Sequence, residues 1–167
     1  MTESQYLTTT IRISAQVCGT EWITCQRSSI RTKSPNPPQV TINKKTILIT
    51  GGAGFIGSNL ALYLQENFSS SQIIVFDCFR NNEVFPNGNL KSFGHYKNLI
   101  GFKGRIICGN INNQGDLALL GEYKIDYIFH LAAISDTRVY DEEIIMRTNV
   151  NSFYDLLTIA KRNKSTI

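Results

Sequence analysis

A short apolar run followed at once by closely spaced glycines constrains the fold of this chain more than any other feature. The run is Thr-Ile-Leu-Ile-Thr at 46–50, and Gly51, Gly54 and Gly57 follow it, with Gly52 offering a second reading of the same spacing. A strand that passes through such a turn into a helix needs glycine where the turn is tight and where a ligand approaches the backbone. The free N–H groups at the start of the helix then attract an anion. The segment therefore predicts a site for the pyrophosphate of a dinucleotide.

The residues that follow the turn support this interpretation over the alternative, a purely structural βαβ unit. We expect a helix near 54–67 whose buried face carries four side chains at helical spacing: Ile56, Leu60, Tyr63 and Leu64. A second apolar strand, 72–77, ends at Asp77, which lies 20 residues after Gly57. A carboxylate at this strand end can accept hydrogen bonds from the hydroxyl groups of an adenosine ribose.

Strand and helix patterns alternate along the rest of the chain. The expected strands are 46–50, 72–77, 105–108 and 125–131, and the expected helices are 54–67, 116–120 and 142–162. Residues 80–104 are expected to form a long loop with one irregular helical turn. The alternation predicts an α/β fold, a Rossmann-type parallel sheet with helices on both faces.

The last helix has a polar residue within its apolar stripe. The stripe consists of Ile145, Phe153, Leu156 and Ala160. Asn149 lies on the same face, and we expect it to point toward the sheet edge. A local or solvated role and a functional role both remain open for it.

Composition restricts the partners of the chain. Residues 1–43 are polar and rich in Ser, Thr and Pro, so we expect a mostly disordered extension before an incomplete domain at 44–167. The net charge of +4 comes from the first 45 residues, and the remainder holds 11 basic and 11 acidic side chains. The lack of net charge in this domain predicts that its partner is a small ligand and not a nucleic acid. No apolar stretch approaches the roughly 20 residues of a membrane span, so we expect no membrane partner.

The four cysteines show no metal-binding or C-x-x-C spacing. We expect reduced thiols in a cytoplasmic protein. Cys78 and Cys108 lie at expected strand ends, where they would serve as small apolar fillers.

From about residue 44 onward, the chain resembles the extended short-chain dehydrogenase/reductase family, the nucleotide-sugar epimerases and dehydratases. The resemblance rests on the glycine turn, on Asp77 and on the segment His130-Leu131-Ala132-Ala133 at a strand end. Within this family, residues 77–82, 94–99 and 110–112 look most like the bacterial ADP-glycero-manno-heptose 6-epimerases.

The resemblance implies a set of cofactor-binding positions. These are Gly51, Gly54, Phe55, Ile56, Gly57, Asp77, Cys78, Arg80, Asn110, Ile111, Leu131, Ala132, Ala133 and Asn149. It places Asn110 and Ile111 beside the adenine, and it gives Asn149 the task of anchoring the strand-end backbone near the cofactor. Ser135, Asp136 and Thr137 stand where such enzymes begin to touch substrate, and a capped loop before the helix is the alternative for them.

Arg80 bears on which dinucleotide is bound. A guanidinium three residues beyond Asp77 can pair with a 2′-phosphate and admit NADP, whereas Asp77 alone repels that phosphate and favours NAD. The sequence leaves NADP and NAD open, and the epimerase that the chain resembles commonly uses NADP.

The resemblance also implies a tyrosine general base with a lysine four residues later, whose charge lowers the tyrosine pKa. None of the seven tyrosines has a lysine at that spacing. We therefore expect the NAD(P)-binding portion of a nucleotide-sugar epimerase/dehydratase, truncated after about four strands and catalytically incomplete alone. It would meet a nucleotide-sugar substrate only if the missing C-terminal part is supplied. A partner chain and a homo-oligomer are both open as protein partners. A non-enzymatic dinucleotide-binding module and a non-functional gene fragment are the alternatives.

Overall fold

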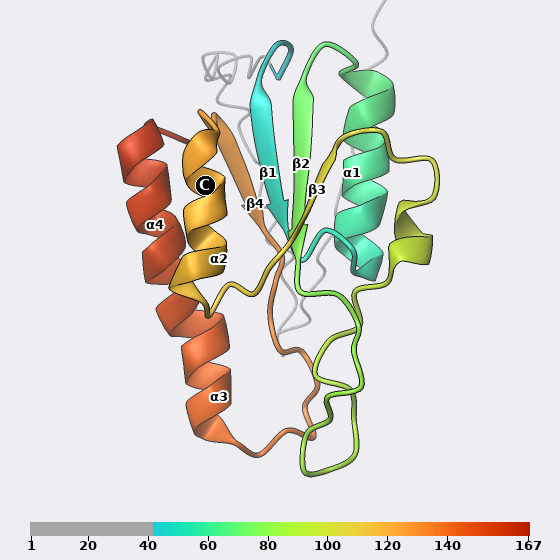
Figure 1. Ribbon diagram of the computed structural model, residues 1–167, viewed down its shortest axis with the longest axis vertical. Helices are drawn as coiled ribbons and strands as arrows, with labels where there is room; N and C mark the ends of the chain where they lie inside the picture. The colour runs from blue at the N-terminus through green and yellow to red at the C-terminus, as the bar shows by residue number, and fades with distance from the viewer. Residues whose placement is uncertain (1–41) are drawn as a thin grey trace, which may run out of the picture. The chain divides into compact units, whose positions relative to one another are not determined.

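The computed structural model describes residues 42–167, so the expectation for residues 1–43 lies almost wholly outside the described residues. The predicted parallel sheet is confirmed. Its strands are β1 (Thr46–Thr50), β2 (Gln72–Asp77), β3 (Arg105–Cys108) and β4 (Tyr127–His130), in the spatial order β3-β2-β1-β4. All neighbouring strands pair in parallel, so their carboxyl ends meet at one edge, where the long loops gather (Figure 1).

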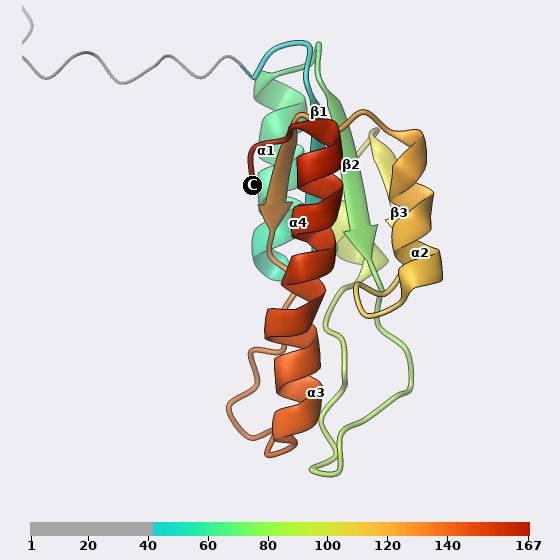
Figure 2. The same ribbon diagram turned by 90° about the vertical axis from the view of Figure 1, so that its left-hand side faces the viewer.

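Helices cover both faces of this sheet. They are α1 (Phe55–Asn67), α2 (Gln114–Ala118), α3 (Glu142–Met146) and α4 (Ser152–Asn163). A 3₁₀ turn, Leu119–Glu122, extends α2, and a second 3₁₀ turn, Tyr96–Leu99, is the irregular turn expected in the long loop. In both views α1 lies on one side of the sheet, and α2 and α4 lie on the other (Figures 1 and 2).

The core has two layers, one on each face of the sheet. In β1, Ile47 and Ile49 pack toward the layer that holds Ala61 and Leu64 of α1, while Leu48 packs toward the layer that holds Leu156 of α4. Both faces of the strands are thus covered. This double burial explains why the strands read as unbroken apolar runs in the sequence.

The predicted buried face of α1 was partly wrong. Ile56 is 69% exposed and Tyr63 is 57% exposed, whereas Gly57, Ser58, Ala61 and Leu64 form the buried face. The reason lies at the first turn of the helix, where a Cβ on Gly57 would come within 2.3 Å of the carbonyl oxygen of Gly51. Gly57 lets α1 pack directly on the turn at Gly51, and this contact sets the rotation of the helix about its own axis. The larger side chains are consequently turned toward solvent.

The last helix is interrupted by a π turn, Arg147–Asn151, between α3 and α4. A π turn holds one residue more than an α-helical turn. The buried residues of α4 are Ser152, Leu156 and Ala160, so the expected stripe is confirmed at Leu156 and Ala160, whereas Phe153 is 37% exposed.

Two smaller expectations also failed. Cys78 and Cys108 are exposed free thiols rather than buried fillers, because each lies at the carboxyl edge of the sheet, beyond the layers of the core. The fourth strand is shorter than 125–131. Its pairing begins at Tyr127, after Asp126 has turned its carboxylate to accept from the N–H of Thr46 at 2.9 Å.

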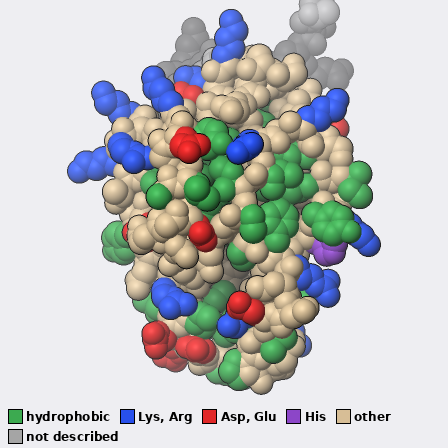
Figure 3. All heavy atoms as spheres, viewed as in Figure 1, with side chains coloured by type: hydrophobic (Ala, Val, Ile, Leu, Met, Phe, Trp, Pro, Cys, Tyr) green, Lys and Arg blue, Asp and Glu red, His purple; other side chains and the backbone are tan. Residues whose placement is uncertain are grey.

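The surface of the domain mixes both signs of charge. Figure 3 shows lysine and arginine side chains spread around one face, an acidic group at the end where α3 begins, and hydrophobic side chains across the middle. Within residues 42–167, no helix combines the length and the apolar character that a bilayer crossing requires. The same residues contain no group of three His, Cys, Asp or Glu side chains arranged to hold a metal ion.

Candidate functional site

The glycine turn is wedged between the ends of three strands. The N–H of Gly51 donates to the carbonyl of Phe76 in β2 at 2.9 Å. Gly51 adopts φ +68°, and a Cβ there would lie 2.7 Å from the nitrogen of Ala132 and 2.8 Å from the carbonyl oxygen of Leu131. Only glycine meets both requirements, the left-handed backbone and the absent side chain. The turn therefore touches β2 on one side and the chain just after β4 on the other.

Helix α1 begins above this turn with free donors. Its first hydrogen bond runs from the N–H of Ser58 to the carbonyl of Gly54 at 3.0 Å, so the amides of Phe55, Ile56 and Gly57 have no helical acceptor. No side chain caps this end, and its first turn holds no acidic residue. The side chains of Phe55 and Ile56 are exposed. The result is an open, positively polarised helix end suited to an anion.

Asp77 stands at the end of β2 and is turned into the glycine loop. One carboxylate oxygen accepts from the N–H of Ala53 at 2.9 Å, and the other accepts from the N–H of Phe79 at 2.8 Å. Gly94 packs so closely on it that a Cβ would lie 2.2 Å from Oδ1. The residue is only 6% exposed, and this burial raises the pKa of the carboxyl group against the opposing effect of the two hydrogen bonds. Asp77 thus ties β2 to the turn, a contact that sequence reasoning missed.

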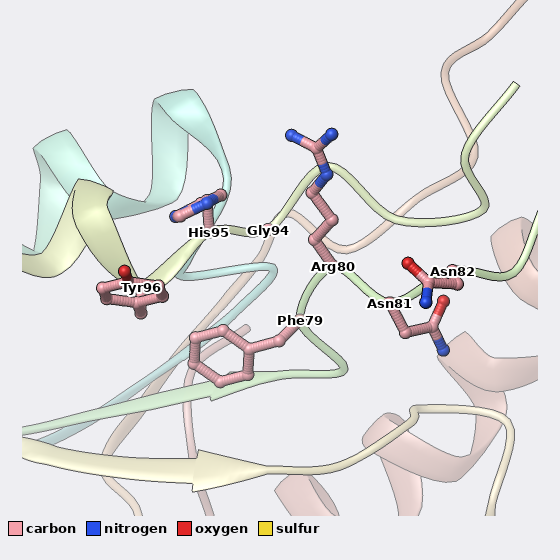
Figure 4. A pocket seen from close by; sticks show the side chains of 7 residues that line it. All are labelled: Phe79, Arg80, Asn81, Asn82, Gly94, His95 and Tyr96. Atoms are coloured by element: carbon pink, nitrogen blue, oxygen red, sulfur yellow. The ribbon is translucent and has the colours of Figure 1, made fainter.

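A pocket of about 240 Å³ opens beside Asp77. Its lining residues are Phe79, Arg80, Asn81, Asn82, Gly94, His95 and Tyr96 (Figure 4). Two main-chain bonds shape it: the N–H of Arg80 donates to the carbonyl of Gly94 at 2.6 Å, and the N–H of His95 donates to the carbonyl of Ala53 at 3.0 Å. Arg80 and His95 extend to the same side of the loop, away from Asn81 and Asn82 (Figure 4). The pocket therefore contacts the glycine turn through His95, whose N–H bonds to Ala53, and it holds the guanidinium of Arg80.

The sequence signalled this pocket by the length of the loop at 80–104 and by Arg80, but it did not signal the residues that meet Arg80 there. His95 and Tyr96, whose rings lie 4.8 Å apart, come from the far end of that loop, so spacing along the chain gives no hint that they meet Arg80. Cys78 lies at the pocket's edge of the sheet but is not one of its lining residues.

The segment after β4, which holds Leu131, Ala132 and Ala133, runs beside the glycine turn. The N–H of Leu131 donates to the carbonyl of Thr50 at 3.1 Å, which continues the β1–β4 pairing by one residue. Leu131 and Ala133 are exposed, and Ala132 is half-buried against Gly51.

Asn149 faces the main chain after β4. Its Oδ1 accepts from the N–H of Ile134 at 2.8 Å, and its Nδ2 donates to the carbonyl of the same residue at 2.9 Å. The neighbouring Thr148 accepts from the side chain of Asn112 at 2.9 Å. The π turn thus holds the loops that follow β3 and β4, and Asn149 fixes the main chain at Ile134.

Asn149→Ala is expected to lower the free energy of unfolding by about 2 kcal/mol, because the half-buried N–H and carbonyl of Ile134 lose their only side-chain partners. Asn163→Ala is the matched control. Its side chain makes a single local bond, to the carbonyl of Ile159 at 3.0 Å, so its loss should cost less than about 1 kcal/mol. Urea denaturation of both variants measures the difference. Equal losses would show that the two hydrogen bonds between Asn149 and Ile134 add nothing to stability beyond a single local bond.

The two residues expected beside the adenine, Asn110 and Ile111, differ from each other in burial. Ile111 is 6% exposed and belongs to the core layer under α2, so it can meet a ligand only through its main chain. Asn110 is exposed, and its Oδ1 accepts from the N–H of Asn112 at 2.9 Å. Burial of an apolar side chain next to a loop cannot be read from periodicity in so short a segment.

The three candidate substrate residues form part of a loop that docks on the long loop. Asp136 accepts from the N–H of Arg138 at 3.0 Å and from the side chain of Asn89, and the hydrogen bonds from Arg138 lower the pKa of this carboxyl. Ser135 and Thr137 are exposed. Asp136 therefore has a structural task here, and the other two side chains stay open to solvent.

The chain matches the model of the NAD dependent epimerase/dehydratase family over residues 47–166. It is 32% identical to an ADP-L-glycero-D-manno-heptose-6-epimerase of Brachyspira hyodysenteriae, over 71% of this chain and 34% of that protein. The crystal structure of the Helicobacter pylori ADP-L-glycero-D-manno-heptose-6-epimerase superposes with a TM-score of 0.66 and 49% identity, over 74% of this chain and 37% of that one.

A more distant solved structure is the dTDP-glucose 4,6-dehydratase of Bacillus anthracis in complex with NAD. Its TM-score is 0.53 at 27% identity, over 71% of this chain and 34% of that one. The chain thus spans about a third of the length of these relatives. With a family match that covers most of its described residues, on a parallel sheet with a glycine turn at its carboxyl edge, the chain belongs to the NAD dependent epimerase/dehydratase family.

Proposed function

We propose that this chain binds NAD(P) as the cofactor-binding portion of a nucleotide-sugar epimerase/dehydratase. The observation that carries the proposal is the open end of α1, where three amides without helical acceptors stand over the glycine turn and beside the Arg80 pocket. A pyrophosphate on those amides would let the adenosine half extend toward the pocket. The solved relative in complex with NAD supports the same assignment.

The proposed substrate class is an ADP-heptose-like nucleotide sugar. The identity of 49% with the Helicobacter pylori enzyme over most of this domain supports this choice. In this proposal the chain alone does not turn over that substrate, since no tyrosine in its sequence has a lysine four residues later. The part of the reaction that these residues perform is to bind and orient the cofactor. When bound, the nicotinamide ring would supply the hydride chemistry.

A further polypeptide, or a second copy of the chain, is proposed to complete the sheet beside β4. Tyr127 already pairs in parallel with Thr166, and the N–H of Ile128 donates to the carbonyl of Thr166 at 2.8 Å. The exposed side chains of Tyr154 and Leu157 leave α4 with apolar surface near this edge. The free, exposed thiols of Cys78 and Cys108 support a cytoplasmic location, where they would stay reduced.

Titration of the purified chain with NADH and NADPH tests the proposed binding. Fluorescence of the reduced nicotinamide should rise and saturate with a Kd in the micromolar range. This corresponds to a binding free energy of about −8 kcal/mol. Failure of both cofactors to bind, in a chain whose circular dichroism shows it folded, would favour the non-functional alternative. Binding without turnover, even after a complementing C-terminal part is added, would favour a non-enzymatic binding module.

Arg80→Ala is expected to weaken NADPH binding about tenfold and to leave NADH binding nearly unchanged, because a charge-assisted bond to the 2′-phosphate is lost. Arg105→Ala is the control, an exposed arginine at the start of β3 that does not line the pocket. Parallel titrations of both variants give the comparison. An equal loss for NADPH and NADH in Arg80→Ala would remove Arg80 from cofactor discrimination.

A further inference from the structure

A buried hydroxyl links a histidine to the glycine turn. Thr50, at the end of β1, is 0% exposed, and its Oγ1 lies 2.7 Å from Nδ1 of His130 at the end of β4. The same oxygen accepts from the N–H of Leu131 at 3.2 Å, which it shares with the carbonyl of Thr50, and from the N–H of Ala132 at 3.4 Å. A hydroxyl has two acceptor positions and one proton. With two amides donating to it, the proton of Thr50 points to His130.

This arrangement requires a particular form of the imidazole. Nδ1 of His130 must accept the proton from Thr50, so Nδ1 must be unprotonated and a neutral ring carries its proton on Nε2. A charged ring would place an N–H on Nδ1, facing the hydroxyl proton. Thr50 would then have to turn its proton away and give up one of its two amide contacts.

The contact with those amides reaches the proposed anion site. The main chain of Leu131 and Ala132 leaves no room for a side chain on Gly51, because a Cβ there would lie 2.7 to 2.8 Å from their atoms. Gly51 in turn accepts from the N–H of Gly54 at 3.1 Å, at the start of α1. A continuous path of packed main chain thus runs from His130 to the amides of the helix end.

The surroundings of His130 favour the neutral ring. The ring is half-buried and stacks on Phe153 of α4, with centroids 5.7 Å apart and planes 19° apart. Burial lowers the pKa of His130, and no charged group contributes to this shift. Thr50 of β1 and Phe153 of α4 are both uncharged, so within residues 42–167 no carboxylate or cation pairs with the ring.

We propose that neutral His130 is a positioning residue that acts through Thr50: it holds Leu131 and Ala132 against Gly51, and its protonation loosens the turn that binds the dinucleotide. The consequence for binding rests on the proposed function, whereas the hydroxyl–imidazole link does not. Because the folded pKa lies below the ordinary 6.5, His130 contributes stability that is present above pH 6.5 and is lost as pH falls through the folded pKa. Dinucleotide affinity should fall over the same interval.

The link itself is tested without cofactor. The chain holds two histidines, so His95→Gln leaves a single imidazole to follow by NMR. In this background His130 should titrate below pH 6.5, with the amide resonances of Leu131 and Ala132 moving at the same midpoint. Thr50→Val should move the midpoint upward, and Thr50→Ser should restore it. An unchanged midpoint in Thr50→Val, or amides that do not follow the titration, would overturn the proposal.

Binding is measured in chains that keep His95. Calorimetric titration with NAD⁺, which lacks a titrating 2′-phosphate, compares pH 7.5 with pH 5.5. Affinity of the natural chain for NAD⁺ should be about tenfold lower at pH 5.5. This is the change expected if the pKa of His130 is about one unit lower in the bound chain than in the free chain. His130→Gln should bind with little dependence on pH, and Thr50→Ser should bind more tightly than Thr50→Val.

The outcomes separate the two proposals. If the natural chain fails to bind NAD⁺ at either pH and NADP⁺ also fails, the proposed function falls, and the NMR titration still decides the link. If NAD⁺ binds with the same pH dependence in the natural chain and in His130→Gln, the positioning role falls and the proposed function stands. Should His130→Gln not fold, Thr50→Val and Thr50→Ser carry the same comparison.

Discussion

Gly51→Ala is expected to abolish dinucleotide binding and to lower the free energy of unfolding by about 3 kcal/mol or more. Two costs combine at this position. Its φ of +68° is unfavourable for alanine by about 1–2 kcal/mol. A new methyl group would also stand 2.7 Å from the nitrogen of Ala132, so the chain after β4 must move away from the turn. Such a shift displaces the amides at the start of α1.

Gly88→Ala separates the two costs. Gly88 also has a positive φ, +81°, but a Cβ there would meet nothing within 4 Å. It should lose only the conformational term, about 1 kcal/mol, and should bind dinucleotide normally. Urea denaturation and fluorescence titration of both variants provide the measurement. If Gly51→Ala loses no more stability than Gly88→Ala, the close packing of the turn on the Leu131–Ala132 segment is not a determinant of the fold.

The second large effect is expected at Asp77. Asp77→Ala should lower the free energy of unfolding by about 2–4 kcal/mol, because the N–H of Ala53, a residue with 0% exposure, loses its acceptor. The glycine turn would also lose its tie to β2, so dinucleotide affinity should fall at least about tenfold. Asp141→Ala is the control. Asp141 accepts from the N–H of Ile144 at 3.1 Å in an exposed cap, worth about 1 kcal/mol.

The pH dependence at Asp77 distinguishes its hydrogen bonds from its charge. Burial raises its folded pKa above 3.8, so its contribution to stability is greatest below pH 3.8 and is lost as pH rises through the folded pKa. Asp77→Asn cannot titrate and should lack this decline. Unfolding measured from pH 3 to pH 7 should therefore show a smaller penalty for Asp77→Asn at neutral pH than at acidic pH. A penalty that grows with pH would mean that the ionised carboxylate is favoured in the folded chain.

Local sequence signals were sufficient where one segment forms one element. The β-rich runs at 46–50 and 72–77 became β1 and β2 with the expected bounds, because each has an apolar centre and each is bounded by turn residues. Regular alternation of strands and helices then allowed the parallel sheet to be predicted, since crossover helices must cover its faces.

Phase and contact across loops could not be predicted in the same way. The buried face of α1 was misassigned at Ile56 and Tyr63, because helical spacing does not say that Gly57 will set the closest approach. The π turn before α4 was not foreseen, because one extra residue in a helix leaves no mark in hydrophobic periodicity. Asp77 was placed correctly at its strand end, but its burial under Gly94 depends on a loop that returns from far along the chain.

By itself, the sequence determined the order of strands and helices, the parallel sheet and the position of the glycine turn, because these depend on backbone sterics and on apolar patterns within a few residues. Only the tertiary structure decided which groups meet around that turn. The pairs Asp77 with Ala53, Thr50 with His130 and Asn149 with Ile134 join residues 15 to 80 positions apart. Such contacts arise when strand ends converge at one edge, and no local pattern encodes them.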